Sequence, residues 1–393
     1  MKKKRIGVPF SGELIGGSHV STMLLLDGLD PAVFEPVVIL HSDGEVADFL
    51  RRRSTPFVIE SMAAIRRWEG SPLRRLLASF QSLLPTMRLI RKHGLDLIHV
   101  QDHKAFQLWV WGALLARRPM LLHCRGIYGR SIVTRIMMRF ATRIVAISRY
   151  LQDRLPAEVG RRAELIYNPF DTDEPLPDRD ARRAALRAEL GLPADSTLLC
   201  WIGTINRRKH PERFVEIVQR LRADRSDEAI FGVLCGGPGN LRDDPSWLRT
   251  LEDAGPAIRM LGFRDPIGPT LAGCDALVVT ADEEPFGRTV IEAMLAGVPV
   301  VAADEGGYVE VMEHGATGLL VPTEDREGFA EAIAGLLDRP DDAQALTANA
   351  RTMAEDGFSI TRHVGAVEAV YRSLLDPPAR SPSPGRLEET AAG

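Results

Sequence analysis

Short segments in which almost every residue is apolar recur along this 393-residue chain, and longer amphipathic segments separate them. Strands buried on both faces of a parallel sheet have this wholly apolar character. Strands that alternate with helices form doubly wound parallel sheets. The pattern therefore predicts the α/β class. We expect strands at residues 5–10, 36–40, 96–100, 120–124, 143–148 and 163–167, and at 198–203, 230–236, 276–280 and 298–303.

Residues 171–180, DTDEPLPDRD, are rich in proline and aspartate and lie between the two groups of strands. Such a composition is typical of an interdomain linker. We therefore expect two α/β domains of similar size, at residues 1–172 and 173–358. The proline- and serine-rich residues 377–393 have little apolar content, and we expect them to be disordered.

Large apolar residues recur at helical spacing between residues 73 and 90. This periodicity predicts an amphipathic helix whose apolar stripe faces the core. Pro85 lies inside the segment and predicts a kink there. A last helix is expected at residues 359–375, with apolar side chains on one side.

The composition excludes several classes of protein. No apolar run approaches the roughly 18 residues of a membrane-spanning helix. The positively charged start of the chain leads into too short an apolar stretch for a signal peptide, so we interpret it as the first strand. The four cysteines are far apart and form no C-x-x-C pair, which indicates neither disulfides nor a zinc site and fits a reducing, cytoplasmic location.

The charge is divided unevenly along the chain. Residues 1–170 contain 26 basic and 14 acidic residues, whereas residues 171–393 contain 23 and 39. The first half is therefore expected to face something anionic. Nucleic acid fits poorly, because few aromatic residues lie among the basic ones and no nucleic-acid motif is present. An anionic membrane surface or a phosphorylated lipid fits better, and solvated helix faces are the simpler alternative.

Residues 283–307 contain the most informative motif. The strand at 276–280 is followed by a turn with Pro285 and Gly287 and then by a helix, whose N-terminus favours phosphate. Glu284 lies in the turn and Glu292 in the helix, where each carboxylate could accept bonds from sugar or ribose hydroxyls. A glutamate pair at this spacing is, by itself, more often solvent-exposed.

Two further loops follow predicted strands. Arg207, Arg208 and Lys209 come after the strand at 198–203, where basic side chains can neutralise a diphosphate. Gly16 and Gly17 come after the first strand and before a helix, where glycines let backbone amides approach a phosphate. Each of these signals is weak alone, because a basic triplet is commonly a solvated loop.

The sequence predicts no metal site. Asp171 and Asp173 form a D-x-D pattern, but they lie in the linker composition. The nine histidines form no H-E-x-x-H or similar ligand set.

Nearly the whole chain, about residues 5–375, resembles family 4 retaining glycosyltransferases, also called the glycosyltransferase group 1 family, and the resemblance rests most heavily on residues 261–321. The match is most specific in EPFGRTVIEAMLAGVPVVAADEGGYVE, residues 284–310, and Asn168-Pro169-Phe170-Asp171 is similar to the family's Asn-Gly-x-Asp element. The resemblance implies the GT-B fold, in which two Rossmann-like domains face a cleft and a C-terminal helix, here 359–376, crosses back to the first domain.

The resemblance also implies the activity and its residues. A nucleoside-diphosphate sugar would bind mainly to the second domain, and a glycan or lipid-linked acceptor to the first, with no metal ion. The implied catalytic residues are Glu284, Lys209, Arg208 and His103. The implied donor-binding residues are Gly16, Gly17, Gly203, Arg208, Lys209, Glu284, Phe286, Gly287, Arg288, Thr289 and Glu292.

The chain departs from the family pattern at two positions. Thr204 stands where an arginine is usual, and Arg208 is the expected substitute. Gln101 stands where a histidine is frequent, so that either His103 takes over near the sugar or His103 is only the start of a helix. These departures keep open a non-catalytic GT-B subunit that binds nucleotide or membrane. A sugar phosphorylase or an epimerase on the same fold fits the sequence less well.

Overall fold

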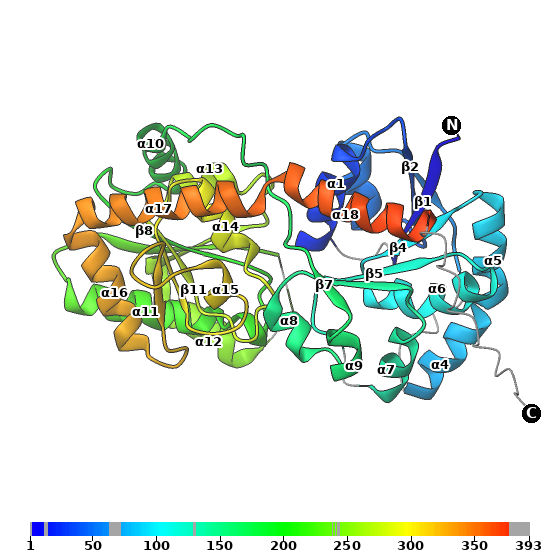
Figure 1. The fold of residues 1–393 in the computed structure, drawn as a ribbon. Helices are drawn as coiled ribbons and strands as arrows, with labels where there is room; N and C mark the ends of the chain where they lie inside the picture. Colours follow the sequence, from blue (N-terminus) through cyan, green and yellow to red (C-terminus); the bar gives the residue numbers. More distant parts are fainter. Residues whose placement is uncertain are drawn as a thin grey trace, which may run out of the picture.

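The computed structural model describes residues 2–11, 15–62, 72–128, 131–237, 239, 241 and 244–376. The predicted disordered tail, 377–393, lies outside the described residues. Two parallel sheets lie side by side, one of seven strands in the order β3-β2-β1-β4-β5-β6-β7 and one of six in the order β10-β9-β8-β11-β12-β13 (Figure 1). Helices cover both faces of each sheet, which confirms the doubly wound α/β class.

The first sheet and its helices use the chain up to residue 165. Its strands are β1 (Lys4–Phe10), β2 (Phe34–Leu40), β3 (Phe57–Ile59), β4 (Leu97–Val100), β5 (Met120–Cys124), β6 (Arg143–Ala146) and β7 (Ala163–Leu165). Its helices are α1 (Gly17–Gly28), α2 (Glu45–Arg52), α4 (Pro72–Gln81), α5 (Leu83–Lys92), α6 (His103–Leu115), α7 (Ile132–Met138), α8 (Arg149–Arg154) and α9 (Ala157–Gly160).

The second sheet begins after the linker. Its strands are β8 (Thr197–Ile202), β9 (Ile230–Cys235), β10 (Ile258–Gly262), β11 (Ala276–Val279), β12 (Val300–Ala303) and β13 (Leu319–Val321). The helices are α10 (Arg179–Leu190), α11 (Pro211–Asp224), α12 (Pro245–Ala254), α13 (Gly268–Ala272), α14 (Arg288–Leu295), α15 (Tyr308–Val311), α16 (Arg326–Asp338), α17 (Pro340–Phe358) and α18 (Ile360–Leu375), with 3₁₀ turns η1 (Arg207–Lys209) and η2 (Gly255–Ala257).

The last helix returns to the first domain. Helix α17 lies along the second domain, the chain bends at Ser359, and α18 continues over the first domain beside α1 (Figure 1). Tyr371 of α18 is fully buried, and its hydroxyl lies 2.6 Å from Nδ1 of His99 in β4. The two domains therefore share a helix in addition to the linker.

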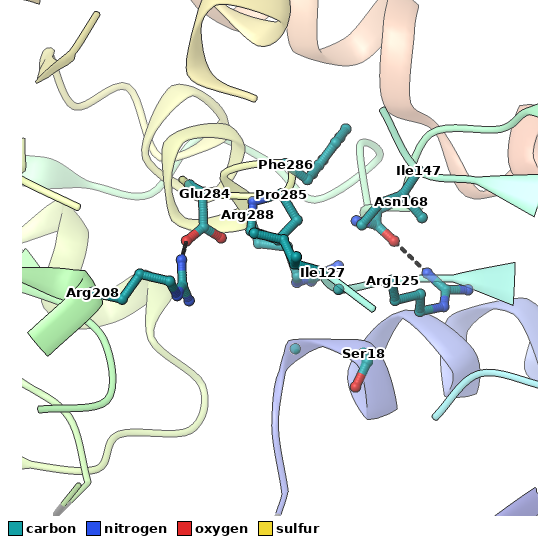
Figure 2. Close-up of a pocket in the computed structure, with 12 residues that line it drawn as sticks. Ser18, Arg125, Ile127, Ile147, Asn168, Arg208, Glu284, Pro285, Phe286 and Arg288 are labelled. Carbon is teal, nitrogen blue, oxygen red and sulfur yellow. Dashed lines mark hydrogen bonds and ion pairs between the residues drawn. The ribbon is translucent and has the colours of Figure 1, made fainter. Parts of the chain in front are cut away.

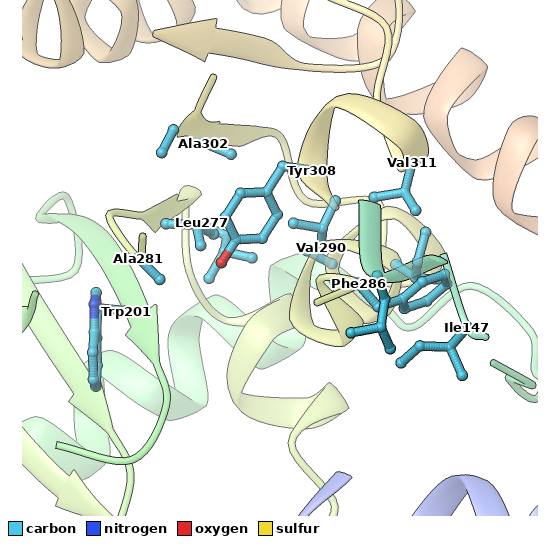
Figure 3. Packing of buried hydrophobic residues seen from close by; sticks show 14 of the residues in the cluster. Ile147, Trp201, Leu277, Ala281, Phe286, Val290, Ala302, Tyr308 and Val311 are labelled. Atoms are coloured by element: carbon cyan, nitrogen blue, oxygen red, sulfur yellow. The ribbon is translucent and has the colours of Figure 1, made fainter. Parts of the chain in front are cut away.

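The two domains also contact each other through an aromatic cluster. Phe286 lies 5.9 Å from Tyr167 and 5.7 Å from Phe358, ring centre to ring centre. Figure 3 shows it between Val290 of its own domain and Ile147 of the first domain. Because burial of a phenylalanine side chain contributes roughly 1.5–3 kcal/mol, this cluster is a substantial part of the interface.

Polar contacts reinforce the same interface. The Glu310 carboxylate of α15 accepts hydrogen bonds from the backbone N–H groups of Arg149, at 2.7 Å, and Tyr150, at 3.3 Å. It also accepts a bond from the Tyr167 hydroxyl at 2.9 Å. A side chain of the second domain thus caps helix α8 of the first, where a negative charge is favoured.

The predicted helix between residues 73 and 90 is interrupted near Pro85, as predicted, but its apolar stripe is less buried than expected. It is two helices, α4 and α5, which meet at Ser82; the Ser82 hydroxyl donates to the Leu108 carbonyl at 2.6 Å. Pro85 lies in the first turn of α5, where a missing N–H costs little. The apolar stripe is also only partly buried, since Leu77, Phe80 and Leu84 are at least half exposed.

These exposed side chains belong to a larger apolar patch on the first domain. Phe80 stacks on Trp111 at 5.2 Å, and Trp111 contacts Phe140 at 5.1 Å, so that α4, α6 and the end of α7 are joined at the surface. The patch consists of Leu77, Phe80, Leu84, Leu114, Leu115, Ile132, Ile136 and Phe140, each at least 41% exposed. Within the described residues, no helix is both long and apolar enough to span a bilayer.

Candidate active site between the two domains

A cavity of about 480 Å³ lies between the domains. Its lining residues from the first domain and the segment before the linker are Gly17, Ser18, Arg125, Gly126, Ile127, Ile147 and Asn168, and those from the second are Arg208, Glu284, Pro285, Phe286 and Arg288. Figure 2 shows Arg208 and Glu284 on one side of this space and Arg125 and Ser18 on the other.

The sheet topology explains why the cavity lies there. In each sheet the first strand lies in the middle, β1 between β2 and β4 and β8 between β9 and β11. In doubly wound sheets, ligands bind at the carboxyl ends of the strands, at the switch point where successive strands begin to be added on the other side of the first strand. Gly16 and Gly17 follow β1, Gly203 to Lys209 follow β8, and Glu284 follows β11. The predicted loops therefore lie at the two switch points.

Glu284 is the centre of the second-domain wall. Its carboxylate accepts hydrogen bonds from Lys209 Nζ at 2.9 Å and Arg208 Nη1 at 2.7 Å, and its side chain is 14% exposed. Burial alone would raise the pKa of Glu284, but the charges and hydrogen bonds of Lys209 and Arg208 lower it to about 2. The carboxylate is thus ionised at neutral pH.

The loop before α11 holds Lys209 in place. The Asn206 side chain accepts a bond from the Lys209 N–H at 3.0 Å. The Lys209 side chain passes over Gly203, where an added Cβ would lie 3.4 Å from Lys209 Cδ. Thr204 is exposed. Arg208, rather than a residue at position 204, supplies the second cation next to Glu284.

The turn before α14 requires a glycine. Gly287 has a φ angle of 94°, and a Cβ there would lie 2.7 Å from the Tyr308 ring. Helix α14 starts at the next residue, and Thr289, in its first turn, is half-buried. The N-terminus of α14 therefore opens beside Glu284, as the sequence predicts. Phe286, one residue before the glycine, contributes to the interdomain cluster as well as to the cavity wall.

The Arg288 guanidinium connects the two domains. It donates to Ser21 Oγ of α1 at 2.5 Å, to the Pro169 carbonyl at 3.3 Å and to Glu292 at 3.1 Å. An added Cβ at Gly17 would lie 2.6 Å from Arg288 Cδ, so Gly17 provides the space for this side chain. Burial raises the pKa of Glu292, and the charge of Arg288 opposes the rise. Gly16 is exposed beside this contact.

His103 is not among the residues that line the cavity. It is the first residue of α6, and its Nε2 lies 3.3 Å from Thr134 Oγ1 and 3.1 Å from Gln107 Nε2. Burial lowers the pKa of His103 to about 4, so the ring is neutral. The structure thus separates His103 from Glu284, Lys209 and Arg208, which it brings together.

Gln101 interacts with a residue that the sequence analysis missed. Its Oε1 accepts bonds from Thr22 Oγ1, at 2.5 Å, and from Arg125 Nε. Arg125 Nη1 donates to Asn168 Oδ1 (Figure 2). Arg125 directly follows the apolar segment at 120–124, and that position at the carboxyl end of a predicted strand could have identified it.

Within the described ranges, no three His, Cys, Asp or Glu side chains are grouped so that they could hold a metal ion. Asp171 and Asp173 of the D-x-D pattern are both exposed in the linker, as the sequence analysis interpreted them. The absence of a metal requirement stays a prediction.

Two family profiles match the chain, one in each domain. The profile described as Glycosyltransferase Family 4 matches residues 15–174, and the profile described as Glycosyl transferases group 1 matches residues 182–353. The chain belongs to glycosyltransferase family 4. The family suspected from residues 284–310 is thereby confirmed.

Named relatives match part of the chain. A D-inositol 3-phosphate glycosyltransferase of Thermobispora bispora is 34% identical over 211 residues, 50% of this chain and 49% of the relative. One of Catenulispora acidiphila is 33% identical over 244 residues, 60% of this chain and 58% of the relative. The chain thus spans about half the length of the curated relatives that it matches.

Solved structures share the whole fold. The Anabaena protein HepE in complex with UDP and glucose has a TM-score of 0.77 at 22% identity, covering 94% of this chain and 100% of HepE. A glycosyltransferase of Rickettsia africae has a TM-score of 0.78 at 15% identity, covering 96% and 100%. These similarities confirm the GT-B fold.

Proposed function

We propose that this protein transfers a hexose from a nucleoside-diphosphate sugar to a hydroxyl group of a glycan or lipid-linked acceptor, with retention of configuration. The observation that carries the proposal is the ion-paired group of Glu284, Lys209 and Arg208 at the cavity. The relatives named D-inositol 3-phosphate glycosyltransferase also support glycosyl transfer, and the UDP and glucose bound to HepE support a sugar nucleotide as the donor.

In this mechanism the donor diphosphate lies between the two cations and the N-terminus of α14. Lys209, Arg208 and the first N–H groups of α14 stabilise the negative charge that develops as the nucleoside diphosphate leaves. The ionised Glu284 accepts hydrogen bonds from hydroxyls of the donor sugar, and Glu292, one turn into α14, accepts bonds from the ribose. Glu284 and the diphosphate then share the same two cations.

The acceptor hydroxyl enters from the face that the diphosphate leaves. Its oxygen forms the new bond to the anomeric carbon as the bond to phosphate breaks, and the departing phosphate oxygen takes the hydroxyl proton. This front-face displacement needs no protein nucleophile or general base. The contacts of Phe286 and Glu310 with the first domain hold the two walls of the cavity together, and closure of the domains on a bound donor would exclude water from it.

We also propose that the reaction needs no divalent cation. The positive charge that a metal ion supplies to a leaving diphosphate comes here from Lys209 and Arg208. A chelator should therefore leave the rate of transfer unchanged. A strict requirement for a divalent ion would contradict this part of the proposal.

We further propose that the protein works on the cytoplasmic face of a membrane, in the synthesis of a cell-surface polysaccharide or glycolipid. The support is the apolar patch of the first domain, whose helices also carry exposed Arg74, Arg88 and Arg135. Such a combination binds an anionic membrane surface, because the apolar side chains enter the lipid interface and the arginines attract the anionic headgroups. An acceptor embedded in the membrane would then lie on the side of the first domain.

The first experiment is a thermal-shift screen against nucleotide sugars and nucleoside diphosphates, followed by transfer assays with the donor that binds. At 100 times Kd a ligand stabilises the folded state by about 2.7 kcal/mol, which is readily detected. Lys209→Ala should lower the rate at least about 100-fold. Arg207→Ala is the matched control, since Arg207 is the exposed neighbour that pairs with Asp244 at 2.9 Å.

Two outcomes would count against the proposed function. Near-normal turnover in Lys209→Ala would remove Lys209 from the mechanism. Binding of a nucleotide without transfer to any acceptor would favour the non-catalytic subunit that the departures at Thr204 and Gln101 left open.

A further inference from the structure

Arg125 is a buried cation whose hydrogen-bond partners are neutral. Its side chain is at the carboxyl end of β5, and the residue is only 8% exposed. Nε donates to the Gln101 amide and Nη1 to the Asn168 amide. Within the part of the chain that the structure describes, Arg125 forms no ion pair with a carboxylate, and its Nη2 has no hydrogen-bond partner.

Such an arrangement is costly. Burial of a charge without a counter-ion is unfavourable by several kcal/mol, and burial of an unpaired donor adds to this. The other arginines of the cavity do not have this problem, because Arg208 pairs with Glu284 and Arg288 with Glu292.

The surroundings keep the arginine charged and well oriented. Burial and the nearby charge of Arg288 lower the pKa of Arg125 to about 9, so the guanidinium is still protonated at neutral pH. Burial and the charge of Arg125 lower the pKa of His99, His123 and His363, which are therefore neutral. A network that stabilises a lone positive charge without neutralising it is suited to binding an anion.

The position of Arg125 fits that interpretation. It lines the cavity with Ser18 of α1, a twelve-residue helix with no acidic side chain in its first turn. A helix N-terminus favours an anion. Gln101, which holds Arg125 Nε, also has a buried Nε2 without a partner among the described residues. One guanidinium nitrogen of Arg125 and one amide nitrogen of Gln101, on neighbouring side chains, thus have no partner among the described residues.

We propose that Arg125 binds an anionic group of the acceptor, a phosphate or a carboxylate, on the first-domain wall of the cavity. The proposal rests on the proposed function, because it adds the chemical class of the acceptor to it. Arg208 and Glu284 lie on the opposite wall (Figure 2), and in the proposed mechanism the donor diphosphate binds there. An arginine fixed at two nitrogens is pre-oriented for an oxyanion.

The test uses inorganic phosphate and acetate as probes of the two anion types, titrated by calorimetry into the full chain saturated with UDP. UDP occupies the donor site, so that remaining anion binding reports a second position. We expect the wild type to bind at least one of the two probes. Arg125→Gln should weaken that binding at least tenfold while the affinity for UDP changes less than twofold. Arg125→Lys, which keeps the positive charge, should retain part of the anion binding.

A substitution on the second-domain wall of the cavity provides the control. Lys209→Ala should weaken UDP binding and leave the binding of phosphate or acetate intact. If the UDP complex of the wild type binds neither probe, the proposal is overturned. If Arg125→Gln weakens the binding of UDP instead, Arg125 belongs to the donor site and the proposal is equally wrong. If the wild type binds none of the nucleotide sugars or nucleoside diphosphates in the thermal-shift screen, the proposed function fails, and the same titration without nucleotide still tests Arg125; if it binds a nucleoside diphosphate other than UDP, that nucleotide replaces UDP in the titration.

A second measurement distinguishes phosphate from carboxylate and does not depend on variants. Transfer from the identified donor is measured to three acceptors that have the same sugar ring: methyl glucoside, glucuronic acid and glucose 6-phosphate. We expect one of the two charged acceptors to exceed the neutral one at least tenfold in kcat/KM. Equal rates with all three would overturn the proposal.

Discussion

Replacement of Glu284 by glutamine is the sharpest test of the charge arrangement in the cavity. Gln has nearly the same shape, so the change removes the negative charge and little else. It leaves Lys209, whose side chain is 14% exposed, and Arg208 without their counter-ion. An unpaired charge in such a position is destabilising. We therefore expect Glu284→Gln to lower the free energy of unfolding at neutral pH.

The size of the effect follows from the pKa. In the folded protein the pKa of Glu284 is about 2, against a usual value of 4.5. At 1.36 kcal/mol per unit, the ionised carboxylate contributes about 3 kcal/mol to stability. Because the folded pKa is depressed, this contribution is complete above pH 4.5 and declines as the pH falls towards 2. The difference between wild type and Glu284→Gln should therefore be constant from pH 5 to 7 and smaller at pH 3.

Urea unfolding followed by tryptophan fluorescence, at pH 7, 4 and 3, measures this difference. Glu158→Gln is the control, since Glu158 forms an ion pair with Arg139 in which both side chains are largely exposed. That variant should differ little from the wild type at any of the three pH values. If Glu284→Gln is as stable as the wild type at pH 7, or equally destabilised at pH 7 and 3, the two cations do not hold the carboxylate ionised.

Three other predictions concern the interface and the patch. Glu310→Gln weakens the cap that the second domain provides to α8. We expect this variant to have a larger radius of gyration in small-angle X-ray scattering and a higher KM for the donor. Unchanged values of both would refute the role of the cap. Gly17→Ala should lower Tm, because the new methyl group displaces the arginine that crosses between the domains, whereas Gly16→Ala has no neighbour within 4 Å and should leave Tm unchanged. Phe80→Ser combined with Leu84→Ser should reduce sedimentation with anionic vesicles at low salt; equal sedimentation of variant and wild type would contradict the membrane surface.

The sequence allowed the fold and the location of the cavity to be predicted because both depend on local pattern. Strands that are apolar at every position predict a parallel sheet, and the loops at their carboxyl ends converge at the switch points. The ten predicted strands are all present. Three strands at the edges of the sheets were missed: β3 and β13 have only three residues each, and β10 contains Arg259 and is only partly buried, so it lacks the wholly apolar character of the others.

The contacts between distant segments were not predictable in the same way. The pairing of Arg288 with Ser21 and the Pro169 carbonyl depends on how two domains pack, and no local pattern encodes it. The exposed side of α4 and α5 was predicted to be buried for a similar reason. A helical stripe shows that one side is apolar, but the sequence does not tell whether another element covers all of it. For His103 the sequence left two alternatives open, and only the three-dimensional arrangement separates the residue from the cavity.

The two walls of the cavity balance their charges in different ways, and this affects the order in which ligands can bind. On the second-domain wall the Glu284 carboxylate pairs with both Lys209 and Arg208 and offsets one of their two positive charges, so an incoming diphosphate shares these cations with a carboxylate. On the first-domain wall the hydrogen bonds of Arg125 within the described residues go to the amides of Gln101 and Asn168, so an anion that binds Arg125 displaces no carboxylate. Occupation of Arg125 therefore does not depend on prior binding of the donor. Under the proposal for Arg125, an acceptor that carries the anion can therefore enter before the donor.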